Sequence, residues 1–139
     1  MIEKDTLYIV GCSKTKIWDK EPDVIPYVEA RHVYKGRGFL KALTQVEWPW
    51  IVLSGKYGFI EPDHPIGRYD IELGRSGSVS NETLKAQVLQ RRFWQTFDNR
   101  YEVRLADFPH IVCLNCDRNY VKKVRASFTR NKIHLRSEK

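Results

Sequence analysis

The chain has 139 residues, of which 42% are hydrophobic and 12% aromatic, and it carries a net charge of +7. This length and composition indicate one folded domain over residues 1–139 and exclude a disordered chain. The longest apolar runs are far shorter than the roughly 20 residues of a membrane span, and the first residues lack a signal-peptide pattern. We therefore expect a cytoplasmic protein with no membrane partner.

Apolar runs and turn residues predict the first elements. Residues 6–10 form a buried strand that ends at a glycine. The next stretch contains Pro22 and Pro26, which exclude a continuous helix and indicate a long functional loop. Apolar residues at helical spacing then predict a helix that begins at residue 34 or 36 and stops before Pro49.

The middle of the chain combines a strand, a loop and the longest predicted helix. Residues 50–53 form a second buried strand, and residues 55–80 form a second long loop rich in Gly, Pro, Asp and Ser. Ser80 or Asn81 then caps a long helix whose arginines lie off its apolar stripe. The stripe consists of Leu84, Val88, Phe93, Phe97 and Tyr101.

The last third predicts a buried strand over residues 111–114, a helix over 118–128 and a short strand over 132–135. Buried strands that alternate with helices imply a parallel sheet covered on both faces. Ligands of such sheets bind beyond the carboxyl ends of the strands. Those ends are residues 11–16, 54–59 and 115–120, where we expect the functional site.

Positive charge is concentrated in the last third of the chain. Residues 1–89 hold 12 Lys/Arg and 12 Asp/Glu, whereas residues 90–139 hold 12 and 5. A concentrated basic face suits a polyanion, which indicates nucleic acid as the partner. A basic solvated surface without a partner is the alternative.

Residues 11–16, Gly-Cys-Ser-Lys-Thr-Lys, bring a thiol, two hydroxyls and two ammonium groups to one strand end. Backbone amides there can form an anion-binding nest, and Lys14 or Lys16 can neutralise a phosphate. An ordinary polar turn with a buried cysteine is the alternative. Cys12 is a candidate nucleophile if the neighbouring lysines favour its thiolate, although the sequence places no histidine as its base.

The chain has three cysteines, so they cannot all pair with one another. Cys113 and Cys116 have CxxC spacing but no second pair completes a tetrahedral zinc site. We predict neither a disulfide framework nor a metal or other cofactor. A metal or iron–sulfur site in which Cys12 joins the other two thiolates is the alternative.

Residues 54–59, Ser-Gly-Lys-Tyr-Gly-Phe, form the most unusual loop. Their glycines permit close backbone approach, their lysine offers a cation, and their aromatic side chains together with Tyr69 offer faces on which a base could stack. Nearby carboxylates, Asp70 among them, could position a water. A structured surface loop closed by its own aromatics is the alternative. The loop residues concerned are Ser54, Gly55, Lys56, Tyr57 and Gly58.

Two sets of motifs resemble known families. Residues 53–62, LSGKYGFIEP, followed by YDIEL at 69–73, resemble a stretch of the peroxide-stress YaaA family. A family of small bacterial and phage domains of unknown function, related to archaeosine synthase-like and tRNA-guanine transglycosylase-like proteins, is similar over more motifs. Those motifs are Cys12-Ser-x-x-Lys16, Ala30-Arg-x-x-Tyr34, Phe39, the SGKYG loop and Tyr120.

This resemblance implies a uracil-DNA-glycosylase-like α/β fold, a three-layer sandwich with a parallel four-stranded sheet between helices. It also implies a connection to nucleic acid or modified nucleobases. We therefore expect an enzyme that cleaves or exchanges an N-glycosidic bond of DNA or RNA. A non-catalytic nucleic-acid-binding stress or defence protein is the alternative.

An enzyme of this kind takes its target base out of the stack, holds it between aromatic faces and reads its edge. Tyr57 or Tyr69 would stack the base, Asn115 would read its edge, and Asp70, with Asp19 as the alternative, would orient a water. We expect Lys16, Ser54, Tyr69 and Asn115 to converge on one cavity. The catalytic candidates are Cys12, Ser13, Lys16 and Asp70. The substrate-binding candidates are Lys14, Tyr34, Ser54, Gly55, Lys56, Tyr57, Gly58, Tyr69, Asn115 and Tyr120. The candidates for contact with the nucleic-acid backbone are Arg91, Arg92, Lys122 and Lys123.

Overall fold

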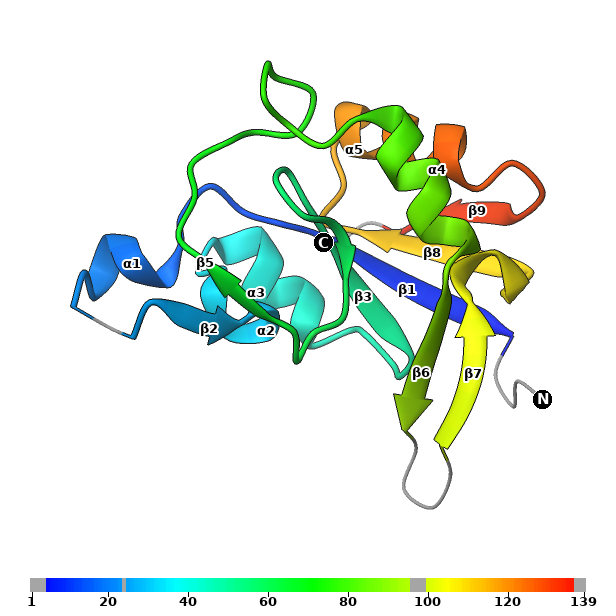
Figure 1. The fold of residues 1–139 in the computed structure, drawn as a ribbon, viewed down its shortest axis with the longest axis horizontal. Helices are drawn as coiled ribbons and strands as arrows, with labels where there is room; N and C mark the ends of the chain where they lie inside the picture. The colour runs from blue at the N-terminus through cyan, green and yellow to red at the C-terminus, as the bar shows by residue number, and fades with distance from the viewer. Residues whose placement is uncertain (1–4, 24, 96–99, 137–139) are drawn as a thin grey trace.

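A computed structural model describes residues 5–23, 25–95 and 100–136. Its centre is a five-stranded sheet with the order β4-β3-β1-β8-β9 (Figure 1). The four predicted strands are all present and parallel to one another. The strands of the sheet are β1 (Thr6–Gly11), β3 (Trp50–Ser54), β4 (Gly58–Ile60), β8 (His110–Leu114) and β9 (Lys132–Leu135).

β4 corrects the predicted count of four strands. It folds back on β3 as an antiparallel edge strand, and its first residue, Gly58, has a φ of +75° that favours glycine. β5 (Pro65–Gly67) is a second strand inside the predicted 55–80 loop, and it pairs with β2 (Tyr27–Glu29). Strands of three residues are too short to show an alternating pattern, so the surrounding Gly and Pro dominate the sequence signal.

The stretch after β1 is also more structured than the predicted loop. Pro22 and Pro26 separate its short elements instead of preventing them, because a proline ends a helix but is accepted at a strand boundary. The helix expected to stop before Pro49 is present but shorter. The helices of this stretch are α1 (Ile17–Lys20), α2 (Ala30–Val33) and α3 (Arg37–Leu43).

Helices cover both faces of the sheet. Leu7 and Ile9 of β1 join the core beneath α4 (Asn81–Leu89) and α5 (Arg118–Ser127). Tyr8 and Val10 point to the other face, where the core includes residues of α2 and α3. The mixed α/β architecture with a mostly parallel sheet is therefore confirmed. Among the described helices, none has the length and apolar character needed to cross a bilayer.

The long helix predicted from residue 80 to Tyr101 is wrong. Ser80 caps α4 by accepting a hydrogen bond from the Thr83 amide at 3.1 Å, but α4 ends at Leu89. The chain then forms a hairpin that projects from the sheet (Figure 1). Its strands are β6 (Arg91–Gln95) and β7 (Arg100–Arg104), and Phe97 lies outside the described residues.

Tertiary contacts explain why helical spacing fails here. The Gln87 side chain accepts from the Phe59 amide at 2.8 Å and donates to the Tyr57 carbonyl at 2.9 Å. Arg92, on β6, donates to the Phe59 carbonyl at 3.2 Å and to Glu61 Oε1 at 2.9 Å. The Gln87 bonds fix the end of α4, and the Arg92 bonds fix the start of β6, against β4 and its flanking residues, and together they override local helix propensity.

Replacing Arg92 with alanine should lower the free energy of unfolding by about 1–3 kcal/mol, because the Phe59 carbonyl loses a donor in a half-buried setting. Arg91 pairs with Glu102 on the exposed side of the hairpin, so Arg91→Ala should leave the urea midpoint almost unchanged. Urea unfolding of both variants measures the difference. Equal losses would contradict the assignment of Arg92 as the anchor of β6.

Candidate functional site

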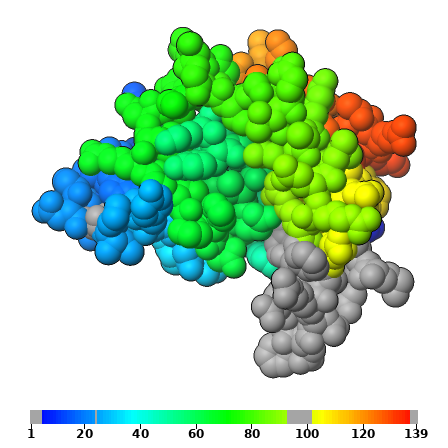
Figure 2. All heavy atoms as spheres, in the orientation of Figure 1, coloured from blue at the N-terminus to red at the C-terminus, as the bar shows by residue number. Residues whose placement is uncertain are grey.

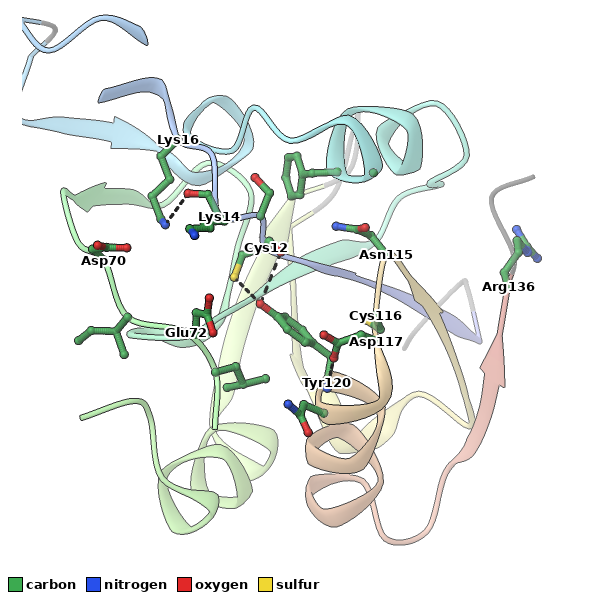
Figure 3. Close-up of a pocket in the computed structure, with 16 residues that line it drawn as sticks. Cys12, Lys14, Lys16, Asp70, Glu72, Asn115, Cys116, Asp117, Tyr120 and Arg136 are labelled. Atoms are coloured by element: carbon green, nitrogen blue, oxygen red, sulfur yellow. Dashed lines mark hydrogen bonds between the residues drawn. The ribbon is translucent and has the colours of Figure 1, made fainter. Parts of the chain in front are cut away.

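The candidate site lies where chain connections diverge. After β1 the chain runs to α2 and α3 on one face of the sheet, and after β8 it runs to α5 on the other face. Adjacent parallel strands with diverging connections leave a crevice at their carboxyl ends. A pocket of about 610 Å³ opens there, lined by residues that follow β1, residues that follow β8 and the segment 70–73 (Figure 3).

Asn115 joins the two strand ends. Its Nδ2 donates to the Gly11 carbonyl at 2.9 Å, and its backbone has a left-handed φ of +53°. Its Oδ1 packs so closely on α3 that a Cβ at Gly38 would lie 2.3 Å away. Asn115 lines the pocket, but its amide first holds β1, β8 and α3 together.

Asn115→Ala should destabilise the protein by about 1 kcal/mol more than Asn115→Gly does. Both variants lose the bond to Gly11, and only alanine adds the strain of a left-handed backbone. Urea unfolding compares the two, with Asn119→Ala as a control because Asn119 is an exposed residue of the same pocket. A glycine variant less stable than the alanine variant would contradict this account.

Cys12 is half-buried in the pocket wall and contacts Tyr120. Its Sγ lies 3.0 Å from the Tyr120 hydroxyl, and its amide donates to the Leu53 carbonyl at 3.1 Å (Figure 3). Burial, followed by the nearby Cys12, raises the pKa of Tyr120, so the phenol stays protonated and able to donate. None of the described residues lining the pocket is a histidine, so the structure places no imidazole beside Cys12 as a base.

Three hydroxyl groups form a buried chain near Cys12. Ser54 Oγ donates to the Tyr69 hydroxyl at 2.9 Å, and the Tyr69 and Tyr34 hydroxyls are 2.5 Å apart. Burial is the main cause that raises the pKa of both phenols, and the nearby Cys12 adds to it. These three hydroxyl groups carry three protons, and the two hydrogen bonds between them use two. One phenolic proton is therefore left to donate to another group.

Lys16 supplies an unusual charge. It is 6% exposed, its Nζ donates to the Lys14 carbonyl at 3.1 Å, and the same Nζ lies 4.7 Å from the centre of the Tyr69 ring. Within the described ranges of the chain, no carboxylate lies within ion-pair distance of Lys16. A buried ammonium without a counter-ion is unfavourable unless an anion is bound. Lys14 is exposed beside it and adds to the positive field.

Carboxylates lie on both sides of the pocket. Asp70 and Glu72 are on one side of Cys12, and Asp117 is on the other, near Asn115 (Figure 3). Asp117 Oδ1 accepts from the Tyr120 amide at 3.1 Å and so caps α5. Glu72 was missed by the sequence prediction, although side chains two residues apart in an extended segment point to the same side. Asp70 was among the predicted site residues, so the sequence analysis identified one of these two carboxylates.

Other predicted residues support the pocket from behind. Ser13 lines it, but its Oγ accepts from the Gly36 amide at 3.0 Å and donates to the Thr15 carbonyl at 2.7 Å. The loop with Lys56, Tyr57 and Gly58 does not line the pocket. Gly55 instead brings the loop backbone against the segment 70–73, because a Cβ there would lie 2.3 Å from the Ile71 carbonyl oxygen. Lys16 and Asn115 therefore share the cavity, whereas Ser54 and Tyr69 do not line it, and Tyr69 lines a neighbouring cavity instead.

The four residues predicted to contact a nucleic-acid backbone lie outside the pocket. Arg91 and Arg92 are on β6 and not on a helix, and Lys123 on α5 donates to Asn81 Oδ1 at 2.7 Å. Lys122 is exposed on α5. Their role stays a prediction. Arg136 was not among the predicted site residues, and it lies at the edge of the pocket because β9 pairs with β8.

Cys113 and Cys116 form a pair of thiols, of which Cys116 lines the pocket. A hydrogen bond between them lowers the pKa of Cys113, and the same bond, with burial, raises the pKa of Cys116. Among the residues that the structure describes, no three His, Cys, Asp or Glu side chains are grouped to hold a metal ion. The alternative of a site with three thiolates thus gains no geometric support.

The fold and site define an α/β protein with a mostly parallel sheet and a polar pocket at the strand ends. Residues 7–137 match the "Family of unknown function (DUF6884)", and the chain belongs to this family. It is 36% identical over 113 residues to the uncharacterized protein YfjM of Bacillus subtilis (strain 168), a match that covers 78% of this chain and 67% of that protein. No solved structure matches the chain. Membership of a family of unknown function is confirmed, and the similarity to YaaA and archaeosine synthase stays a prediction.

Proposed function

We propose that this protein is an enzyme that cleaves or exchanges the N-glycosidic bond of a base in nucleic acid. The observation that carries the proposal is the buried ammonium of Lys16, which has no carboxylate partner in the described chain, lies over the Tyr69 ring and lines the same pocket as Cys12. An anion bound there, either a phosphate or a leaving base, would compensate its charge. A pocket of about 610 Å³ is large enough for a nucleotide.

The pocket offers groups for each part of a glycosidic cleavage. Asp70 accepts a proton from a water whose oxygen bonds to the sugar C1′, while the bond from C1′ to the base nitrogen breaks. The electron pair of that bond leaves with the base, whose negative charge faces Lys16 and the protonated Tyr120. Glu72 lies close in sequence and also lines the pocket, so a second carboxylate faces the cationic sugar. In an exchange reaction, a second base takes the place of the water.

Tyr120 and Phe39 are the aromatic residues that line the main pocket. They are better placed to hold a base than Tyr57 and Tyr69, the residues to which the sequence assigned that task. The glycosylase-like architecture is part of the same proposal. Four parallel strands between two helical layers support it.

Lys16→Met keeps the aliphatic stem and removes the charge. We expect an unchanged or higher Tm, because a buried ammonium without a carboxylate destabilises the folded chain. Affinity for a nucleoside monophosphate should fall by about tenfold or more, because a charge-assisted bond to the phosphate is lost. Calorimetry and thermal unfolding measure the two effects, with exposed Lys14→Met as the control for stability. A destabilised variant that keeps its affinity would contradict a ligand-binding role.

Turnover tests the proposal directly. The protein is incubated with transfer RNA and with DNA that carry modified bases, and released bases are identified by mass spectrometry. Asp70→Asn should lower the rate of release by about a hundredfold while binding persists. Asp63→Asn is the matched control, since this exposed carboxylate lies outside the pocket.

The opposite result would favour a non-catalytic binding protein. That result is no released or exchanged base from any substrate, together with nucleic-acid binding that neither Lys16→Met nor Asp70→Asn changes.

A further inference from the structure

A second hollow lies beside the candidate site, between α1, β2, β5 and the SGKYG loop. It has a volume of about 430 Å³, and its walls include the aromatic side chains of Trp18, Tyr27 and Tyr57 and the cations of Lys56 and Arg68. None of its described lining residues is acidic. We call this hollow the aromatic groove. In the space-filling view, the segment that holds α1 and β2 forms one margin of the molecule (Figure 2).

The aromatic groove is linked to the main pocket by a cavity that shares wall residues with both. A connecting cavity of about 350 Å³ shares Trp18 and Arg68 with the groove, and it shares Lys14, Lys16 and Asp70 with the pocket. Its other carboxylate, Asp19, accepts from the Lys16 amide at 2.8 Å. We call these three adjoining cavities, which have cations along their length, the path.

Gly67 leaves room for the side chains of Tyr27 and Tyr57 in the groove. Tyr27 is 64% exposed and lies opposite Gly67, where a Cβ would come within 3.2 Å of its ring. The Tyr57 hydroxyl accepts from the Gly67 amide at 3.2 Å, and Lys56 Nζ lies 5.3 Å from the centre of the Tyr57 ring. A large exposed ring next to cations is unusual for a solvated surface and suits stacking of a base with its phosphate nearby.

We propose that this path binds a single strand of nucleic acid whose target nucleotide enters the main pocket. The neighbouring bases stack on Tyr27 and Tyr57, and their phosphates lie near Lys56, Arg68 and Lys14. A duplex does not fit this arrangement, because its bases are stacked on one another and cannot reach the rings. The inference rests on the proposed function and names its substrate class: a single-stranded segment, not a free nucleoside.

Binding of oligonucleotides by the full chain tests the path. Fluorescence anisotropy is measured with labelled oligothymidylates and oligouridylates of increasing length, at two or more salt concentrations. Affinity should rise with length until the path is filled. Tyr27→Ala should weaken binding of the longer oligonucleotides by about tenfold, because one stacking face is lost. Arg68→Ala should weaken binding and reduce the slope of log affinity against log salt by about one.

Two controls separate the path from general charge and stability. Leu40→Ala and Lys41→Ala remove an exposed apolar side chain and an exposed cation from α3, outside the three cavities, and should leave binding unchanged. Thermal unfolding checks that Tyr27→Ala and Arg68→Ala are folded, which their exposure favours.

Three results would overturn the path. They are an affinity independent of length, equal binding of the matching duplex, and equal binding of an acidic peptide of the same charge. Failure of the proposed function gives a different result. Length-dependent binding without turnover would support the binding path and contradict the proposed enzymatic activity. Turnover of free nucleosides as efficient as that of oligonucleotides would contradict the binding path and support the proposed enzymatic activity.

Discussion

The hydrogen bond from Asn115 to the Gly11 carbonyl is the interaction on which the site depends. It joins the ends of two parallel strands at the point where their connections leave for opposite faces of the sheet. Cys12 follows one end and Tyr120 follows the other, so the 3.0 Å contact between their side chains exists only while these ends stay together. A single amide thus couples the topology of the sheet to the chemistry of the pocket.

The pocket contains buried polar and charged groups, unlike the apolar cores that stabilise the rest of the fold. Most other buried positions hold apolar side chains, whereas here an ammonium that pairs with no carboxylate of the described residues lies over the ring of Tyr69, whose hydroxyl belongs to a buried hydrogen-bonded chain. Natural proteins accept such departures at functional sites and compensate for them elsewhere. The two apolar cores on either side of the sheet supply that compensation. Arg92 differs from Lys16, because its guanidinium donates to backbone and carboxylate oxygens and so stabilises the fold.

The sequence predicted the parts of the molecule that local patterns determine. Continuous apolar runs located β1, β3 and β8, and the turn residues after them located the site. The helix through Tyr101 was wrong because spacing along the chain does not register the tertiary contacts of Gln87 and Arg92 with Phe59 of β4. Arg136 could not be assigned to the pocket, since its place depends on the pairing of strands distant in sequence. Tyr57 was chosen for stacking, but tertiary packing turned it toward the neighbouring groove.

The basic residues on and just after β9 also affect the exposed edge of the sheet. In the described part of the chain it forms an outer edge of the sheet, where unpaired backbone groups are a template for pairing with another molecule. Lys132, His134 and Arg136 are exposed on and just after this strand. Charged side chains on an edge discourage such pairing, since two copies would bring like charges together. Part of the positive charge near the end of the chain therefore protects the protein against aggregation, independently of any ligand.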